Sequence, residues 1–241
     1  MHPYPIRKFR VREHRQETPD TITLALEPAD GEPMFSYRAG QFIMLHLLNA
    51  DGTVWAKSAY SMAMAPEESK DHLELGIKVT GDFTKRCASL KKGDEVGVQG
   101  PYGMFTIRED ANPLVFFAGG VGVTPLKSMM RSYLLSGGSS EVFLFYSGKT
   151  REGMAYEQEF RDLAKAHNNF HLILILTQEV PEGWDGEHER VSIDMVKKYV
   201  PNAATGRAFV CGPKPFMDAV RAILAAMGMD VASRLHKESF G

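Results

Sequence analysis

The sequence predicts a two-domain fold: an antiparallel β-barrel over residues 1–110, followed by an α/β domain with a parallel sheet over residues 111–241. The first part contains short runs with a two-residue apolar period, bounded by Gly, Pro and Asp, which is typical of antiparallel strands. In the second part strand-like and helix-like runs alternate, which favours a parallel sheet covered on both faces. Between the two parts lies the polar stretch REDANP, residues 108–113, which ends in proline.

Short strand-like runs carry the prediction of the barrel, with one helix among them. In DHLELGIKV, Leu73, Leu75 and Ile77 share one face and Glu74 lies on the other. The expected strands are TITLALEP (21–28), QFIMLHLL (41–48), DHLELGIKV (71–79) and GDEVGVQG (93–100), and the expected helix is DFTKRCASL (82–90).

The second part begins with an apolar strand and an amphipathic helix that Gly137 ends. Alternation of strands and helices then continues to the end of the chain. The expected strands are 114–118, 141–147, 171–177, 207–212 and 230–236, and the expected helices are 125–136, 155–167, 192–200 and 215–228.

The composition is that of an ordinary folded protein. Hydrophobic residues make up 44% of the chain and the formal net charge is −2, which argues against disorder and against a broad nucleic-acid surface. No apolar run approaches the ~20 residues needed to span a bilayer, and no signal-peptide core is present, so we expect a cytoplasmic protein. Cys87 and Cys211 are too few for a disulfide framework or for an iron–sulfur cluster held by four thiolates. We therefore expect neither an iron–sulfur cluster nor another metal site.

The junction AGGVGVTP, between the first strand of the second part and its helix, is rich in glycine. Thr124 is expected to cap the helix with its hydroxyl, and Pro125 to take the first helical position, where no amide is needed. Gly119, Gly120 and Gly122 let the backbone turn sharply and let a ligand approach it. The start of the helix then favours a phosphate. A plain strand-to-helix turn explains the same residues equally well.

A second junction of this kind is FVCGPKPFMD, which contains Cys211, Gly212 and Pro213. Ligands of open parallel sheets bind at the carboxyl ends of the strands, so two turns of small residues predict a shared cleft there. Cys211 is either a nucleophile or a buried small residue that lines this cleft. The second interpretation is favoured, because no histidine–carboxylate pair lies near Cys211 in the sequence.

Further short motifs lie along the chain in a fixed order with these two junctions. The full set is RAGQF (38–42), SAYS (58–61), GDFT (81–84), GPYGMF (100–105), AGGVGVTP (118–125), CGPKPF (211–216) and HKESFG (236–241). No single motif is specific, but their shared order is. Taken in this order, the motifs resemble the ferredoxin–NADP(+) reductase superfamily, in which a flavin-binding barrel precedes a nicotinamide-binding domain. The resemblance extends over nearly the whole chain.

The resemblance implies FAD or FMN as cofactor, NADH or NADPH as electron donor, and a site shared by the two domains. The implied flavin residues are Ser58, Ala59, Tyr60, Ser61, Ile77, Lys78, Gly81, Asp82, Phe83, Thr84 and Phe240. The implied nicotinamide-nucleotide residues are Gly119, Gly120, Gly122, Val123, Thr124, Pro125, Lys149, Cys211, Gly212, Pro213 and Phe216.

Within these sets the resemblance implies particular roles. The Tyr60 ring would pack on the isoalloxazine, and the Ser61 hydroxyl would reach its N5 edge, where hydride arrives. Phe240 would stack on the other flavin face until nicotinamide displaces it. Ser61, Cys211 and Glu238 are the expected catalytic residues, the last two orienting the nicotinamide by charge and contact rather than by covalent chemistry. Gly81 to Thr84 would offer amides and a hydroxyl to the flavin pyrophosphate.

One position departs from the family. The motif arginine that pairs with the flavin phosphates is Ser58 here, and the adjacent Lys57 lies on the opposite face of a strand. Arg86 or Lys85, near the pyrophosphate turn, would supply the missing charge. The departure leaves the choice between FAD and FMN open.

The choice between NADH and NADPH depends on the loop TQEVPEG, which contains Glu179 and no arginine. This favours NADH, although Lys149 and Arg151 in SGKTREG remain candidates to meet a 2′-phosphate.

The function that this resemblance implies is an NAD(P)H-oxidising flavoprotein reductase. Its electrons would pass through the flavin to a separate protein, such as a ferredoxin, an oxygenase component or another iron–sulfur or haem protein, or would flow in the reverse direction. We expect a monomer or weak oligomer that binds no nucleic acid and has no membrane span. The alternatives are a flavin reductase that releases reduced flavin and a flavin-containing electron-transfer subunit of a larger complex; a non-enzymatic binding module is the least favoured.

Overall fold

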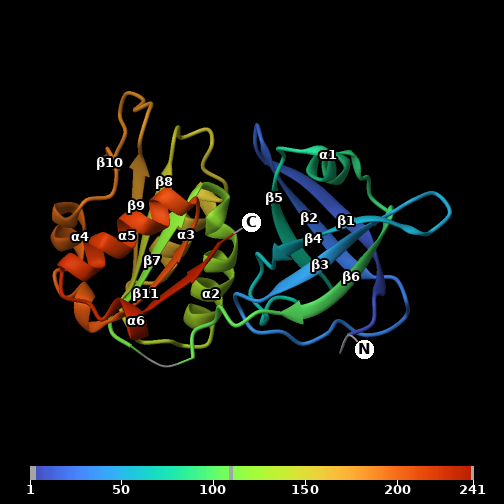
Figure 1. Ribbon diagram of the computed structural model, residues 1–241, viewed down its shortest axis with the longest axis horizontal. Coiled ribbons are helices and arrows are strands. Elements are labelled where there is room, and N and C mark those ends of the chain that lie inside the picture. The colour runs from blue at the N-terminus through green and yellow to red at the C-terminus, as the bar shows by residue number, and fades with distance from the viewer. Residues whose placement is uncertain (1–3, 109–110, 240–241) are drawn as a thin grey trace. The chain divides into compact units, whose positions relative to one another are not determined.

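The computed structural model describes residues 4–108 and 111–239. Its contacts divide the chain into two compact units. The first unit runs up to Ile107 and also contains Lys127–Leu135. The second unit comprises Arg108–Leu126 and the residues from Ser136 onwards. Each unit is built around its own sheet (Figure 1).

The first unit is a six-stranded antiparallel barrel with the strand order β4-β3-β6-β1-β2-β5. An antiparallel bridge between Met62, just after β4, and Leu75 of β5 joins the two ends of this order. Helix α1, Asp82–Ser89, lies between β5 and β6. The strands are β1 (Arg7–Thr18), β2 (Thr21–Pro28), β3 (Phe42–Leu48), β4 (Val54–Ser61), β5 (Leu73–Lys78) and β6 (Glu95–Tyr102).

Alternation along the strands builds the core of the barrel. Leu73, Leu75 and Ile77 are fully buried in it, as their two-residue period predicts. Glu74 lies on the other face and is nevertheless 8% exposed. Its carboxylate accepts a hydrogen bond of 2.8 Å from the Arg15 guanidinium, which compensates for the loss of water.

The second unit is a six-stranded parallel sheet with the order β10-β9-β8-β7-β11-β12. The central strand β7 is buried along its whole length, as expected for a strand covered on both faces. The strands are β7 (Leu114–Gly119), β8 (Val142–Gly148), β9 (Phe170–Leu176), β10 (Glu187–His188), β11 (Arg207–Cys211) and β12 (Leu235–Glu238). The helices are α2 (Val123–Leu135), α3 (Glu157–Ala166), α4 (Ile193–Tyr199), α5 (Lys214–Ala226) and α6 (Val231–Arg234), with single 3₁₀ turns at Gly120–Gly122 and Ala203–Thr205.

Helices α4 and α5 pack on one face of this sheet, where Val196 and Val220 join a core with Phe117 and Phe145. The two phenylalanine rings stack with centroids 5.0 Å apart. The barrel and the parallel α/β sheet together confirm the predicted fold class.

Two expected elements differ from the structure. The last strand was expected over residues 230–236, but Val231–Arg234 form the short helix α6 and the strand is Leu235–Glu238. Asp230 caps this helix by accepting a hydrogen bond of 3.1 Å from the Ala232 amide, and this local bond competes with extended backbone.

Helix α2 begins two residues before the expected start and contributes to both units. Its later part belongs to the first unit, where the Ser128 hydroxyl donates to the Met64 carbonyl over 2.7 Å and the Ser132 hydroxyl donates to Glu67 over 2.8 Å. Across residues 4–108 and 111–239, no helix combines the length and the apolar character needed to cross a membrane.

Candidate functional site

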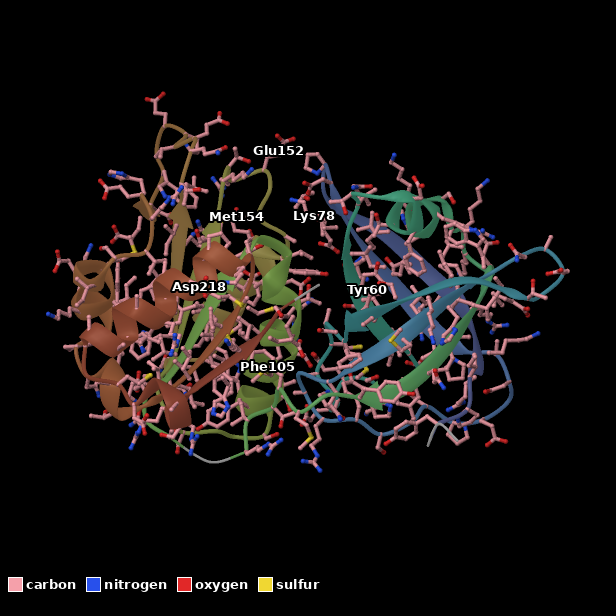
Figure 2. All side chains as sticks on the ribbon, viewed as in Figure 1. Tyr60, Lys78, Phe105, Glu152, Met154 and Asp218 are labelled. Atoms are coloured by element: carbon pink, nitrogen blue, oxygen red, sulfur yellow. The ribbon has the colours of Figure 1, made fainter. Side chains whose placement is uncertain are left out.

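In the first unit, the motif SAYS forms the end of β4. Ser58 and Tyr60 are half-buried while Lys57 and Ala59 are exposed, so Lys57 points away from Ser58 as predicted. Burial, with a smaller contribution from Cys87, raises the pKa of Tyr60 from 10.0 to about 12, although a hydrogen bond with Ser58 acts in the opposite direction. Tyr60 therefore presents a neutral ring that is partly open to solvent. It is labelled in Figure 2.

Tyr60 belongs to a stack of aromatic rings between β4 and α1. The Tyr60 and Phe83 rings are nearly parallel, with centroids 6.1 Å apart, and Phe83 stacks in turn on Trp55 at 6.2 Å. Sequence reasoning missed Trp55, because a strict two-residue period places it on the face opposite Tyr60. A register shift between Leu47 and Leu48 gives β4 one extra residue at this point, and such a bulge changes the direction of the side chains.

The turn before α1 contains the motif GDFT. The backbone of Gly81 is open, since a Cβ there would meet no atom within 4 Å. The Thr84 hydroxyl donates to the Gly81 carbonyl over 2.9 Å and accepts from the amides of Thr80 and Gly81 over 2.9 and 3.0 Å. The hydroxyl thus binds within its own turn. The first amides of α1 have no acceptor inside the helix, so they are the stronger candidates for an anion.

The residues suggested to replace the motif arginine have different surroundings. Arg86 donates to the Leu48 carbonyl over 2.6 Å, and its guanidinium lies 4.7 Å from the centre of the Trp55 ring. Lys85 is exposed. Compensation by Arg86 therefore stays a prediction, and it requires this guanidinium to release or share the Leu48 carbonyl.

The remaining residues of the implied flavin set take contrasting positions. Ser61 is 3% exposed and Ile77 is fully buried in the barrel core, so Ile77 offers only its backbone to a ligand. Lys78 pairs with Asp20 over 2.8 Å. Phe240 lies outside the described residues.

In the second unit, the two predicted turns lie against each other at the carboxyl ends of β7 and β11. These strands are parallel neighbours, with Ala118 beside Cys211. A Cβ added to Gly122 would stand 2.3 Å from the Cys211 carbonyl oxygen, and one added to Gly212 would stand 2.9 Å from the Cα of Gly119. Glycine is therefore required at these positions by close backbone approach. The structure brings the two motifs together as predicted.

The predicted cap of α2 is wrong in detail. The helical backbone starts at the 3₁₀ turn Gly120–Gly122 and α2 continues it from Val123, so Thr124 already lies inside the helix. Its hydroxyl donates to the Val121 carbonyl over 2.8 Å instead of accepting an amide. The positive φ of Gly120, +55°, allows the chain to coil directly after β7, which moves the helix start forward.

Cys211 and Glu238 lie side by side in register on β11 and β12. Cys211 is fully buried, and this burial together with the Glu238 carboxylate raises the pKa of its thiol well above the ordinary value. A thiol that stays protonated is a poor nucleophile. The structure thus favours a buried small residue over a nucleophile at Cys211.

Beside these turns, the loops after β8 and β9 enclose a recess of about 490 Å³. Glu152 and Met154 of the first loop are labelled in Figure 2. The amides of Gln178 and Glu179 donate to the Lys149 carbonyl over 3.1 and 3.2 Å, which ties the two loops together. The recess is lined by Thr150, Arg151, Glu152, Glu157, Glu179 and Pro181. Of these, sequence reasoning identified Arg151 and Glu179 only, since Glu157 reaches the recess from the start of α3.

No group of three or more His, Cys, Asp and Glu side chains suited to a metal ion is found within residues 4–108 and 111–239. Gly122 and Gly212 are required for the packing of one turn on the other, whereas Gly120, where a Cβ would meet no atom within 4 Å, leaves backbone open to a dinucleotide. The half-exposed Tyr60 ring and the open turn at Gly81 fit a flavin with a pyrophosphate.

Comparison with known proteins agrees with this arrangement. Residues 8–107 match the family model for the oxidoreductase FAD-binding domain, and residues 116–222 match that for the oxidoreductase NAD-binding domain. The chain is 31% identical over 230 residues to the glycine betaine monooxygenase reductase subunit of Pseudomonas aeruginosa, covering 94% of this chain and 62% of that protein. It is 31% identical to the propane 2-monooxygenase reductase component of Rhodococcus jostii, covering 93% and 61%. It thus spans less than two thirds of the length of these relatives.

A solved structure shows the same fold. The FAD/NAD-binding domain of nitric oxide dioxygenase from Vibrio cholerae superposes with a TM-score of 0.86 at 25% identity, over 98% of both chains. Together, the two domain matches, the relatives and this superposition identify the chain as a member of the ferredoxin–NADP(+) reductase superfamily.

Proposed function

We propose that this chain is an NAD(P)H-oxidising flavoprotein reductase that passes electrons through a bound flavin to a separate protein acceptor. The proposal is supported by the contact of the two turns at the carboxyl ends of β7 and β11, where Gly122 and Gly212 allow the close packing and Gly120 leaves open backbone. The reductase components of glycine betaine and propane 2-monooxygenases, which are relatives of this chain, support an oxygenase component as the acceptor class. A ferredoxin is the other acceptor we consider.

For the barrel, we propose that residues 1–110 hold FAD. The Tyr60 ring would supply an apolar surface to the isoalloxazine, and the amides at the start of α1 would bind the pyrophosphate. A bound flavin would supply the conversion of two-electron to one-electron transfer. The hydrogen bonds of the Thr84 hydroxyl with the Gly81 backbone would make the turn that carries these amides more rigid.

For the second unit, we propose that residues 111–241 hold the nicotinamide nucleotide. The buried Cys211 thiol would lie behind the nicotinamide ring and exclude water there, and the Glu238 carboxylate would favour the positive charge of the oxidised ring. Both side chains would orient the ring without forming a covalent bond to it.

We propose NADH as the preferred donor. Glu152, Glu157 and Glu179 line the recess beside the turns, and like charges in this position oppose a 2′-phosphate. Arg151 is the single cation among the lining residues and is already paired with Glu157.

A second candidate function is a flavin reductase that releases its reduced product. Ser58 favours it, because this residue hydrogen-bonds to Tyr60 and has no charge with which to hold a flavin phosphate. Retention of flavin through gel filtration decides between the two functions, and the reductase proposal predicts a protein that stays yellow.

The test of the main proposal is NADH-driven reduction of one-electron acceptor proteins by the purified holoprotein. We expect reduction of a ferredoxin or of an oxygenase component, without release of free flavin. Reduction of none of these acceptors, in a protein that keeps its flavin, would contradict the proposal. Turnover that appears only when free flavin is added would favour the flavin reductase.

A further inference from the structure

Arg151 is the cation best placed to meet a 2′-phosphate in the recess after β8 and β9, yet the structure holds it in an ion pair. Its Nε donates to one oxygen of Glu157 over 3.1 Å, and a terminal nitrogen lies 3.0 Å from the other oxygen. The guanidinium also lies 5.9 Å from the centre of the Trp184 ring. Both oxygens of the carboxylate therefore meet the same guanidinium, which is the strong form of this pair.

Glu157 is the fixed member of the pair. Its side chain is 13% exposed, against 54% for Arg151. A second guanidinium, from Arg161, donates to Glu157 over 2.8 Å. Arg161 is itself anchored by Asp185, with two hydrogen bonds of 2.8 Å. Because Arg161 also holds Glu157 and is itself anchored, Arg151 is the partner that is free to move away.

We propose that Glu157 determines which nicotinamide nucleotide the recess accepts by keeping Arg151 from a 2′-phosphate. This inference rests on the proposed binding of a nicotinamide nucleotide in the second unit. A phosphate of this kind is recognised by the paired donors of a guanidinium. In the wild-type protein those donors face Glu157, so the recess suits an adenosine ribose that carries hydroxyls only.

The same geometry predicts that the recess can bind the 2′-phosphate of NADPH once Arg151 is released. Loss of the charge on Glu157 frees Arg151 to turn its donors towards the ligand, and Arg161 keeps its bonds to Asp185. Glu179 provides the matched control, because it lines the same recess and forms no hydrogen bond or ion pair with Arg151 in the described part of the chain. Glu157→Gln and Glu179→Gln thus remove one negative charge each, and only the first releases the guanidinium.

The test measures binding of adenosine 2′,5′-bisphosphate and of 5′-AMP by calorimetry, with the purified holoprotein. For Glu157→Gln we expect the affinity for the bisphosphate, relative to 5′-AMP, to rise by roughly two- to fivefold, the range that one charge-assisted pair at a half-exposed site supplies. The double variant Glu157→Gln/Arg151→Ala should lose this gain. The kcat/KM ratio of NADPH to NADH should change in the same direction.

Arg151→Ala alone gives a second test, at an exposed position where folding is not at risk. Since Arg151 is already paired with Glu157 in the wild type, we expect this substitution to lower the affinity for the bisphosphate less in the wild type than it does in Glu157→Gln. An equal loss in the two backgrounds would overturn the inference. So would an equal gain for Glu157→Gln and Glu179→Gln, or a gain that survives removal of Arg151.

These outcomes are distinct from failure of the proposed function. If the wild type and all variants bound neither adenosine nucleotide, nor NADH, the assignment of the second unit would itself be wrong, and the inference would fail with it. Binding of 5′-AMP with an unchanged preference would overturn the inference alone.

Discussion

The candidate sites of the two units are built differently. In the second unit, the site consists of backbone: Gly122 and Gly212 lie so close to the neighbouring turn that a single methyl group would collide with main-chain atoms. In the first unit it consists of side chains, with Tyr60 and Phe83 between β4 and α1 and an open glycine at Gly81. Adding a side chain at Gly122 or Gly212 therefore disrupts the packing of the turns, whereas replacing a side chain such as Tyr60 changes ligand affinity by a limited amount.

This difference concerns the departure from the superfamily motif that the resemblance implies at Ser58. Replacing a charged side chain, as at Ser58, leaves the fold of β4 intact and changes only what the strand can bind. A comparable change at Gly122 would separate the two turns. We therefore expect substitutions at the site of the first unit to change ligand affinity gradually, and substitutions at the two turns of the second unit to abolish binding.

The largest expected effect tests this contrast with two alanine substitutions. Gly122→Ala places a Cβ 2.3 Å from the Cys211 carbonyl and should destabilise the second unit by about 1–3 kcal/mol, as overpacking does. It should also abolish NADH binding. Gly81→Ala, where the added Cβ meets nothing within 4 Å, should change the unfolding midpoint little. Thermal unfolding and NADH titration of both variants measure the difference. Equal effects would show that close backbone packing does not distinguish Gly122 from Gly81.

The second effect concerns Tyr60 as a flavin surface. Tyr60→Ala removes the ring that stacks on Phe83 and should reduce flavin affinity about tenfold or more, whereas Tyr60→Phe keeps the ring and should change it little. Flavin retained after dialysis, quantified by absorbance, gives the result. Equal loss in both variants would mean that the hydroxyl, and not the ring, is what binds.

The third effect concerns the positive charge that the superfamily motif has at position 58. Ser58→Arg reintroduces a guanidinium on the half-buried face of β4, and we expect flavin affinity to rise by roughly threefold to tenfold through one charge-assisted hydrogen bond. Arg86→Ala is the companion variant: if Arg86 already supplies the charge, affinity falls in this variant and Ser58→Arg rescues it. Unchanged affinity in Arg86→Ala would refute compensation by Arg86.

A weaker effect follows from the pKa of Tyr60. Because its pKa is raised from 10.0 to about 12 in the folded protein, the folded state holds the phenolic proton more tightly than the unfolded state does. The resulting stabilisation is complete below pH 10 and is lost as the pH rises through 12. Denaturant unfolding over this range should therefore show a steeper decline for the wild type than for Tyr60→Phe. Parallel curves would show that Tyr60 titrates normally.

Much of this arrangement could be predicted from the sequence, because it depends on local patterns. Two-residue and helical periods predicted most of the strands and helices, but not the short strand β10 or helix α6, and the two glycine turns meet at the strand ends as predicted. The start of α2 was missed, because the 3₁₀ turn at Gly120–Gly122 depends on a left-handed backbone that no periodicity shows. Trp55 was missed for a similar reason, since one bulge in β4 reversed its face.

Glu157 was missed for a different reason. Its partner Arg151 is only six residues away, but their ion pair depends on how the loop after β8 turns back towards α3. Burial of Glu74 likewise depends on Arg15, a residue of another strand. Contacts of this kind are decided by the tertiary fold and leave no signal in the spacing of the residues.

The most direct test of the central claim is anaerobic titration of the purified holoprotein with NADH, followed through the visible absorbance of the bound flavin. We expect NADH to bleach the flavin, NADPH to do so less efficiently, and Gly122→Ala to retain its flavin but lose the response. A flavin that neither nucleotide reduces would show that the protein is not a nicotinamide-dependent reductase.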